Sequence, residues 1–584
     1  MIRKTFRQML TAQILSAMTV MLCMLVDSIM IGRFLGVDSV AAYGLSNPVL
    51  LVFAAYGSML SAGIQVLCGK TMGAGDRDAT DACYTVALVL GIGVSVIGMI
   101  LILLFASPVC TLLGAGKAGP DNPVFFLTRD YLRGFIIGAP AFIVAQIMVP
   151  FLQISGNRTR LAAAVLLMTV TDVVFDLLNV FVFKGGTFGM GLASSLSYYA
   201  ALLIGGTYFL KKDCLFRFRP KAIRLRRAGE LLKYGVPTVI NQLSLVALVF
   251  TLNKILLSVG ANVAVAAYSV VSTVGNICYC FGTGVASVAL LLSSVSYSEE
   301  DRHALHDLVK TMSIYAVVLD VLVTVAVLLL APLLVQLFLT DNPGARSLAA
   351  LGIRLFALSL LPCSLNTSFK NYFQGVNRTL LTEAISVMQN FAFPALFAFI
   401  LSAPFGTTGA FLCFVCGETL TLAVIAAIVW IKNRRVSFSA ESFALLPKSF
   451  GALPKDLFEA TVRTNEQAAK TAQEAAVFCR AHGESERSSM LISLCVEEMV
   501  ENIVTHGFKE GKRNQSVDVR IVFKEDARVI RIRDNCMSFD PLQYLKLHEA
   551  DDPFSHIGIR MVAKLVKRAD YVNVLGLNSL TLIL

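Results

Sequence analysis

The sequence predicts a chain of two domains: an all-α polytopic membrane domain with twelve transmembrane helices in two six-helix bundles, and a C-terminal α/β-sandwich domain. Composition is the first observation that predicts this division, because only 15% of the 584 residues are charged and 56% are hydrophobic. Soluble domains carry about 25% charged residues. The second observation is a change near residue 435, where long apolar runs give way to the composition of an ordinary soluble protein. The third is an internal repeat within the apolar part.

Twelve apolar segments are long enough to cross a bilayer as helices. They lie near residues 9–32, 46–68, 84–106, 130–153, 160–183, 188–210, 232–257, 268–293, 311–339, 349–370, 381–402 and 407–431. Together with the change in composition, the segments predict three regions of the chain. These are a membrane domain over residues 1–435, a linker over 436–450 and a soluble domain over 451–584.

Basic residues gather in alternate loops between the apolar segments. The loop after the sixth segment is the richest, with eight Lys or Arg between Lys211 and Arg227, and the opposite loops hold few charges. The positive-inside rule therefore predicts that both termini and the soluble domain lie in the cytoplasm, with the apolar segments in the membrane lipid. This distribution also accounts for the net charge of +11, so we expect no nucleic-acid partner.

The apolar part repeats itself in the same order. Val40–Gly44 recurs as Val265–Ser269, and Asn157–Thr159 recurs as Asn377–Thr379. The repeats span about 1–215 and 225–435. Each holds six segments, an even number, so the two halves have the same orientation and are expected to be related by an axis along the membrane normal. Proteins of this construction place a substrate site between the halves.

Five motifs in the apolar part carry a family resemblance. They are Val26–Gly36 (VDSIMIGRFLG), Ala41–Pro48 (AAYGLSNP), Gly73–Asp76 (GAGD), Gly185–Ala193 (GGTFGMGLA) and Gln374–Thr379 (QGVNRT). Together they resemble the MATE multidrug efflux transporters, over roughly residues 5–435. The resemblance implies a secondary active transporter of a bacterial cytoplasmic membrane that exports a small molecule, typically an organic cation, in antiport with H⁺ or Na⁺.

Carboxylates inside the predicted spans are candidates for ion coupling, because an ionisable group deep in a membrane is costly. Asp27 lies in the first segment, and Asp172, Asp176 and Asn179 share one face of the fifth. Two carboxylates that meet in low dielectric cannot both ionise comfortably, so one is expected to carry a proton near neutral pH. With Asn179 they form, alternatively, an oxygen site for Na⁺. The bland alternative is that each Asp pairs with a polar neighbour or lies closer to the membrane interface.

The MATE resemblance supports two of these carboxylates and departs elsewhere. Asp27 and Asp176 stand where the family carries membrane-embedded Asp, whereas Asp172 stands where the family has Asn. In the second half, Asn253 and Lys254 replace the equivalent acidic position, which resembles the DinF-like branch more than the Na⁺-driven NorM branch. Lys254 either pairs with Glu418 in the last segment or extends its ammonium toward the membrane surface.

The tail after residue 450 has the periodicity of an α/β domain. We expect helices over Ala460–Cys479, Glu484–Phe508 and Ile557–Lys567. Strands are expected over Val517–Phe523, Val529–Arg533, Tyr571–Leu575 and Ser579–Leu584.

The tail motifs, taken in order, resemble the GHKL ATP-binding fold, in particular its anti-sigma-factor serine-kinase branch. They are Leu494–Gly507 (LCVEEMVENIVTHG), Asp534–Pro541 (DNCMSFDP), Ser555–Ile559 (SHIGI) and Leu577–Thr581 (LNSLT). The resemblance implies that Asn502 holds Mg²⁺ and that Glu498 acts as general base or orients the attacking group. It further implies that Asp534 accepts the adenine amino group, that Gly558 admits phosphate to backbone N–H groups, and that Thr581 supports Asp534.

Two positions in the tail depart from the GHKL pattern. Cys536 and Ser538 stand where glycines follow the adenine-binding Asp. A Cβ at either position narrows the close approach of a nucleotide to the backbone, which predicts either a low nucleotide affinity or a remodelled pocket. No helix with a phosphoacceptor His precedes the domain, which disfavours histidine autophosphorylation.

The predicted function joins the two parts. We expect a MATE-like antiporter whose tail binds ATP and Mg²⁺, and either gates transport or phosphorylates Ser or Thr on a partner that resembles an anti-anti-sigma (STAS) protein. ATP does not drive transport directly, because the sequence has no Walker A loop. The alternative is a membrane sensor that binds a ligand and signals through the kinase-like tail. A lipid-linked precursor flippase is a third, weaker possibility, which the MATE motifs argue against.

Overall fold

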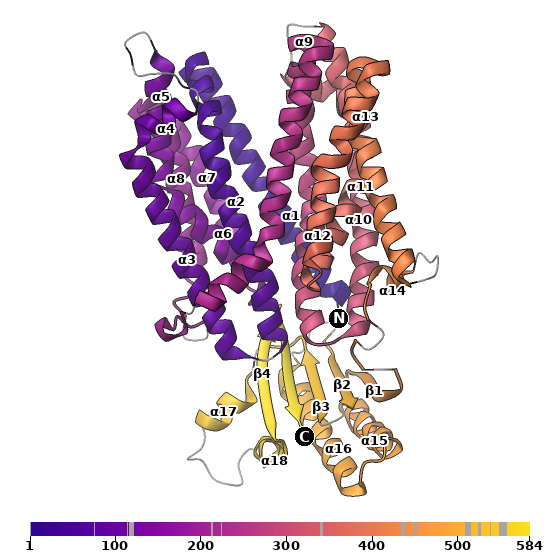
Figure 1. The fold of residues 1–584 in the computed structure, drawn as a ribbon. Helices are drawn as coiled ribbons and strands as arrows, with labels where there is room; N and C mark the ends of the chain where they lie inside the picture. Colours follow the sequence, from indigo (N-terminus) through magenta and orange to yellow (C-terminus); the bar gives the residue numbers. More distant parts are fainter. Residues whose placement is uncertain are drawn as a thin grey trace.

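A computed structural model describes most of the chain. It describes residues 2–74, 76–113, 115, 119, 122–211, 214–223, 225–338, 343–433, 439–447, 450–452, 454–508, 515–523, 527–537, 539–547 and 557–584. The helices form two bundles side by side, and the tail lies across one end of both (Figure 1). The N-terminus lies at that same end, which we call the tail side.

Within the described residues, the first bundle contains eight helices, and the second contains five, one of which runs through two spans. The first bundle consists of α1 (Ile2–Met30), α2 (Val37–Gly73), α3 (Arg77–Leu104), α4 (Ala106–Leu112), α5 (Pro123–Ile136), α6 (Ala139–Ile154), α7 (Arg158–Leu178) and α8 (Gly186–Gly206). The second consists of α9 (Leu225–Ser298), α10 (Arg302–Phe338), α11 (Pro343–Gly375), α12 (Thr379–Val387) and α13 (Phe393–Asn433). π-Helical turns follow α1, α7 and α12 at Ile31–Leu35, Asn179–Phe183 and Met388–Ala392. The predicted two-bundle domain is confirmed.

The described helices provide fewer candidate membrane spans than the twelve predicted. Within the described residues, nine helices are long and apolar enough to cross a membrane, or ten if α5 and α6, bent by 47°, count as one span. One of the nine, Thr379–Asn433, has 55 residues and would be about 80 Å long if straight. It bends at Gly406, where φ is 60° and ψ is −136°, a conformation that favours glycine. This bend falls between the last two predicted segments, and the count of twelve stays a prediction.

The two bundles meet on the tail side, where α2 packs against α9. Ser294 Oγ donates to the carbonyl oxygen of Gln65 at 2.8 Å. A Cβ on Gly69 would lie 2.1 Å from Ser294 Oγ, and one on Gly73 would lie 1.9 Å from Ser298 Oγ. Small residues allow this close helix approach within a membrane. We call this contact the seam. Toward the opposite end the bundles diverge (Figure 1).

The tail is a five-stranded antiparallel sheet in the order β1-β2-β3-β5-β4 with helices on one face. Its strands are β1 (Leu457–Val462), β2 (Val517–Phe523), β3 (Arg528–Asp534), β4 (Arg568–Val574) and β5 (Leu577–Ile583). Its helices are α15 (Asn465–Ala481), α16 (Glu486–Asn502), α17 (Pro541–Leu547) and α18 (Ile557–Leu565), and a π-helical turn (Ile503–Gly507) extends α16. The predicted α/β class is confirmed.

One expected tail helix begins later than predicted. The segment expected as helix from Ala460 is strand β1 as far as Val462, and the helix starts at Asn465. Thr464, two residues after the strand, caps the helix, because its Oγ1 accepts from the backbone N–H of Gln467 at 3.3 Å. Pairing with β2 along the sheet edge overrides the helical pattern of this short segment.

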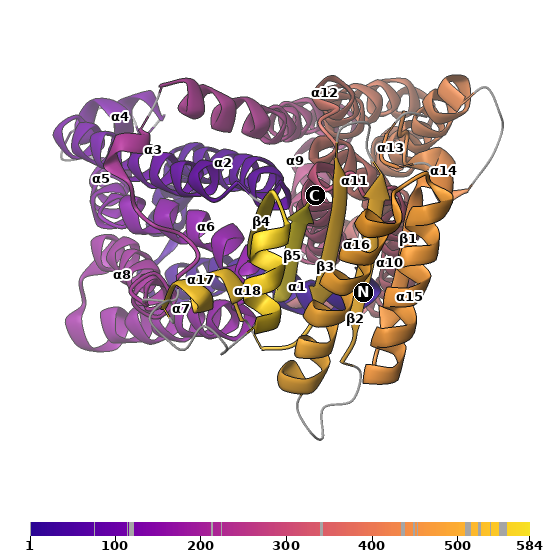
Figure 2. The same ribbon diagram turned by 90° about the horizontal axis from the view of Figure 1, so that it is seen from below.

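The two faces of the sheet have different partners. The inner face packs Val519, Ile521, Ile530 and Ile532 against α15, α16 and α18. The outer face turns toward the helical domain and carries arginines on β2 and β3. Apolar residues of β4 and of the β4–β5 turn, among them Val572, join the core of the seam. Viewed from the tail side, β4 lies nearest the first bundle and β1 nearest the second (Figure 2).

Candidate functional site

Three predicted carboxylates converge in the first bundle. Asp27 of α1 lies within hydrogen-bonding reach of both Asp172 and Asp176 of α7, and all three are buried. Ser194 Oγ of α8 donates to Asp27 Oδ2 at 3.4 Å. Both oxygens of Asp176 and one oxygen each of Asp27 and Asp172 have no hydrogen-bond donor among the described residues.

This geometry defines what the cluster can bind. Ionised carboxylates only accept hydrogen bonds, so a contact between two of them is completed by a shared proton or a bound cation. The bland alternative, in which each Asp is satisfied by a polar neighbour, does not account for the unpartnered oxygens. Helices α1 and α7 both continue into π-helical turns beyond these carboxylates, and such turns are frequent at functional sites.

Asn179 has a different role from the one expected. Its Oδ1 accepts from the backbone N–H of Gly185 at 3.0 Å, and its Nδ2 donates to the carbonyl oxygen of Gly186 at 3.0 Å. The amide therefore fixes the turn between α7 and α8. Regular helical spacing predicts Asn179 on the carboxylate face, but the π-helical turn that begins at this residue changes the register and commits the side chain to the turn.

A second buried polar cluster, which the sequence did not predict, lies in the second bundle. Gln389 stands between two charged groups: its Oε1 accepts from Lys370 Nζ at 3.2 Å, and its Nε2 donates to Glu418 Oε1 at 3.4 Å. Asn366 Nδ2 donates to Glu418 Oε2 at 2.8 Å. The pairing of Lys254 with Glu418 is wrong, because Lys254 is exposed on α9 and Lys370 is the cation that joins this network.

Asp320 is another residue that the sequence-based predictions missed. It lies on α10, is 1% exposed and has an unpartnered Oδ2. It stands in the middle of the predicted segment 311–339, so the signal that singles out Asp27, a carboxylate within a span, applies equally to it.

The predicted adenine acceptor is at the end of β3, on the inner face of the sheet. Asp534 Oδ1 accepts from the backbone N–H of Cys536 at 2.9 Å and from Asn578 Nδ2 at 2.7 Å. Burial raises the pKa of Asp534, and these two hydrogen bonds oppose the rise. Asn578 Oδ1 in turn accepts from Tyr571 Oη at 2.7 Å.

Asn578 takes the position that the prediction gave to Thr581. Successive residues of β5 alternate between the two faces of the sheet, and Thr581, three residues after Asn578, lies on the outer face. There its Oγ1 accepts from Arg531 Nε at 3.4 Å. The prediction that Thr581 supports Asp534 is corrected, and Asn578, paired with Asp534 across the strands, supplies that support.

Glu498 and Asn502 lie on one face of α16, as their spacing predicts. The Glu498 carboxylate sits against Gly558 near the start of α18, and a Cβ on Gly558 would lie 2.0 Å from Glu498 Oε2. The N-terminus of a helix favours an anion, so Glu498 occupies a place suited to phosphate. Both Glu498 and Asn502 are half-buried.

These residues fit a magnesium nucleotide: a buried acceptor, an amide oxygen and a glycine at a helix start. Cys536 lies beside Gly507, where a Cβ on the glycine would stand 3.4 Å from the Cys536 Cβ, an ordinary contact distance, and the narrowing of the pocket by Cys536 stays a prediction. Ser538 and the start of the predicted phosphate motif, residues 555 and 556, lie outside the described residues.

Comparison with known proteins agrees with both parts of the chain. The MatE family model matches residues 13–178 and 237–400, and the model of the histidine kinase-like ATPase domain matches residues 461–584. Multidrug export protein MepA of Staphylococcus aureus is 22% identical over 401 residues, which are 68% of this chain and 87% of that protein. Probable multidrug resistance protein YoeA of Bacillus subtilis is 27% identical over 297 residues, or 48% of this chain and 61% of that protein.

Solved structures show the same helical fold. A MATE protein in complex with MaL6 superposes with a TM-score of 0.68 at 20% identity, covering 74% of this chain and 96% of that one. The Vibrio cholerae MATE transporter VcmN in its bent form has a TM-score of 0.67 at 18% identity, covering 76% of this chain and 97% of that one. More than half of the chain matches the family model, in the two halves that the repeat defines. The chain therefore belongs to the MatE family of multi-pass membrane transporters and carries a histidine kinase-like ATPase domain at its C-terminus.

Proposed function

We propose that this protein exports small molecules of the organic-cation class in exchange for H⁺, and that its cytoplasmic tail regulates the exchange. The observation that carries the proposal is the convergence of Asp27, Asp172 and Asp176 with four unpartnered buried oxygens. A group that takes up and releases a cation inside the membrane couples that movement to the membrane potential and the ion gradient. The multidrug names of the relatives MepA and YoeA support drugs as the exported class.

The same geometry favours H⁺ over Na⁺. A proton shared between two carboxylates needs no further ligand, whereas Na⁺ needs a shell of several oxygens, and the amide of Asn179 is committed to a turn. Alternating access supplies the rest of the mechanism: the cluster is loaded with the bundles parted on one side of the membrane and unloaded with them parted on the other.

The tail is proposed to bind ATP with Mg²⁺. Asp534 would accept the adenine amino group, Asn502 would hold Mg²⁺ through its amide oxygen, and the start of α18 at Gly558 would receive phosphate. The nucleotide supplies a transferable phosphoryl group. Glu498 would then orient the attacking Ser or Thr hydroxyl of the protein that the tail phosphorylates, such as a STAS-like partner. Binding of phosphate at Gly558 requires the Glu498 carboxylate to move away.

Transport into vesicles tests the transporter proposal against the sensor alternative. In inside-out vesicles that contain the full chain, an imposed proton gradient should drive accumulation of a labelled organic cation, and a protonophore should abolish it. A Na⁺ gradient alone should not drive it. Accumulation driven only by Na⁺ would overturn the choice of ion. If the protein binds the cation and no gradient drives accumulation, the sensor alternative is favoured instead.

Nucleotide binding should depend on pH through Asp534. Its ionised carboxylate is the better acceptor, so affinity for Mg-ATP should fall as the pH is lowered through its pKa, which burial raises. The pH dependence of folding stability has the opposite direction from that of nucleotide affinity. Because the pKa of Asp534 is raised in the folded tail, the folded tail binds more protons than the unfolded tail at pH values between the ordinary and the raised pKa. This group's contribution to stability is therefore lost as the pH rises through that window. Titration of fluorescent-nucleotide binding at successive pH values should show the fall, and Asp534→Asn should flatten it.

A further inference from the structure

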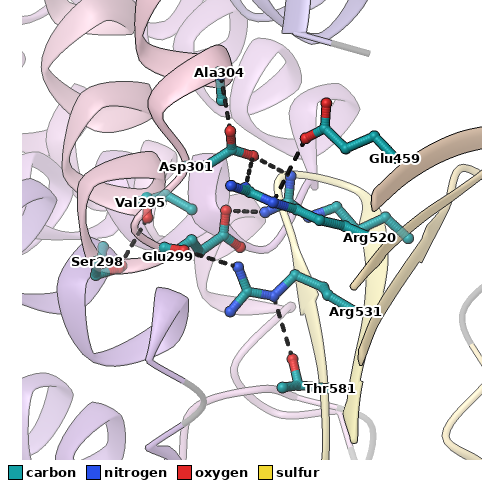
Figure 3. Close-up of polar contacts among 11 residues, drawn as sticks. Val295, Ser298, Glu299, Asp301, Ala304, Glu459, Arg520, Arg531 and Thr581 are labelled. Atoms are coloured by element: carbon teal, nitrogen blue, oxygen red, sulfur yellow. Dashed lines mark hydrogen bonds and ion pairs between the residues drawn. The ribbon is translucent and has the colours of Figure 1, made fainter. Parts of the chain in front are cut away.

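Charged side chains join the outer face of the tail sheet to the helical domain. Arg520 Nη1 lies 2.7 Å from Asp301 Oδ2 (Figure 3), and Arg533 pairs with Glu299. Arg531 Nη1 donates to the carbonyl oxygen of Glu299 at 3.2 Å. Burial lowers the pKa of Arg531 and of Arg533 to about 10. Buried charges are costly unless they are paired, so this face of the sheet is built for the acidic turn between α9 and α10.

The linker fastens the tail to the same bundle. Tyr372 Oη of α11 donates to the carbonyl oxygen of Ala444 at 3.1 Å, and Arg378 Nη2 donates to that of Leu445 at 2.6 Å. Arg302, at the start of α10, donates to the carbonyl oxygen of Phe450 at 3.0 and 3.1 Å. Together with the covalent connection through α13, these bonds make the tail an appendage of the second bundle.

The contact with the first bundle lies at the other edge of the sheet. Arg77, at the start of α3, donates from Nε to the carbonyl oxygen of Tyr571 at 3.1 Å, and its Nη2 lies 2.8 Å from Asp540 Oδ2. The backbone N–H of Leu575 donates to the carbonyl oxygen of Ile154 at 2.6 Å. Gly156 meets the β4–β5 turn so closely that a Cβ there would lie 2.7 Å from Cα of Gly576.

We propose that the tail is a clamp: it is fixed to the second bundle, and its grip on the first bundle through Arg77, Ile154 and Gly156 holds the seam closed. The sheet touches both bundles at the end where α2 and α9 meet. Opening of the seam would separate Ile154 and Arg77 from the acidic turn at Glu299–Asp301. A rigid sheet cannot follow both, and the contact that lacks the covalent linker is the one that breaks. The clamp itself does not depend on the proposed transport; only its effect on export rests on that proposal.

The grip on the first bundle adjoins the proposed nucleotide site. Tyr571 offers its carbonyl oxygen to Arg77 and its hydroxyl to Asn578, the residue that supports Asp534. Its Oη also accepts from the backbone N–H of Phe539, next to Asp540. A nucleotide bound at Asp534 would therefore contact groups that are hydrogen-bonded to the strand and the loop that hold Arg77. A nucleotide is thus the class of ligand suited to regulate the clamp.

Amide hydrogen exchange of the full chain in lipid nanodiscs tests the clamp, because it reports local opening. Gly156→Ala places a methyl group against the β4–β5 turn, and Arg77→Ala removes the polar grip without altering the turn. In both variants, exchange should quicken by roughly fivefold or more in the β4–β5 turn and also along the seam, in residues 62–73 and 288–298. If Gly156→Ala does not fold, Arg77→Ala carries the test alone.

Gly36→Ala is the matched control. Gly36 lies in the first bundle with φ +87° and Gly156 has φ +71°, so alanine is strained at both positions, but a Cβ at position 36 has nothing within 4 Å. Its seam should exchange as in the wild type. Faster exchange in the β4–β5 turn with an unchanged seam would overturn the clamp, and so would an unchanged turn.

Nucleotide control is tested in the same samples. Saturating Mg-ATP should change exchange in the β4–β5 turn of the wild type but not of Asp534→Asn, and no change in the wild type would refute control by nucleotide. The vesicle assay is read separately. A seam that opens in a protein without measurable transport leaves the clamp standing and removes only the transporter proposal.

Discussion

The double variant Asp27→Asn and Asp176→Asn is expected to reduce drug export to background. An amide neither exchanges a proton at physiological pH nor balances a cation, so the variant loses ion coupling while keeping the shape of both side chains. Each charge that moves with the ion across 100 mV contributes about 2.3 kcal/mol, which is roughly a fiftyfold concentration ratio. Efflux of a fluorescent organic cation from cells without their own pumps measures the loss.

Stability separates this result from misfolding. The cluster holds buried carboxylate oxygens without partners, and removal of like charges from such a site should not lower the thermal midpoint of the purified protein. Asp320→Asn is the matched control: it makes the same chemical change at a carboxylate that is equally buried and partly unpartnered, but in the second bundle. Full efflux by the double variant would remove these carboxylates from the coupling mechanism. Equal loss in Asp320→Asn would move the coupling site to include the second bundle.

Asn502→Ala is expected to weaken binding of Mg-ATP by the full chain by roughly 10- to 100-fold or more, because the variant lacks the amide oxygen that would bind the metal. Binding of ATP in the presence of a chelator should change little, since Asp534 and the start of α18 remain. This difference between the two titrations is specific to a metal ligand, and calorimetry or a fluorescent nucleotide measures both.

Two further variants sharpen the test of the nucleotide site. Asn465→Ala removes an exposed tail amide that donates to Thr505 Oγ1 at 3.2 Å, so it should leave both titrations unchanged. Glu498→Gln should keep nucleotide binding and lower phosphoryl transfer by about 10²- to 10⁴-fold, if transfer occurs. Absence of binding by the wild type at millimolar Mg-ATP would make the tail a scaffold without a nucleotide, and the predicted narrowing at Cys536 would be the first cause to examine.

The helical domain is predictable because the membrane restricts the choice of structure. Backbone polar groups in lipid must be satisfied within each segment, so apolar length alone indicates helices, and the repeat indicates two bundles. Burial of Asp27 and Asp176 follows from the cost of a charge in a span. The same rule applies to Asp320, which the predictions omit. The polar network around Lys370 joins α9, α11, α13 and the π-helical turn Met388–Ala392, whose packing no local pattern specifies.

The errors in the tail and at Asn179 have local causes. The motif gives Thr581 its predicted role, but alternation along β5 puts Asn578, rather than Thr581, on the face of Asp534. The prediction for Asn179 depends on α-helical spacing, and a π-helical turn begins at that residue. Arg520 and Asp301, which form an ion pair, are 219 positions apart in the sequence. Nothing in the sequence around either residue predicts that the two meet.

The covalent linker has a consequence for how strong the docking of the tail needs to be. A domain held by a short tether experiences an effective concentration of its docking surface of order millimolar, so a contact too weak to persist between separate proteins stays formed here. Ionic strength should then act unequally on the two edges of the sheet. The Arg77 side chain is 55% exposed and its pair with Asp540 is open to screening, whereas Arg520 and Asp301 are shielded from ions. Added salt should therefore loosen the first bundle while the tail stays attached to the second.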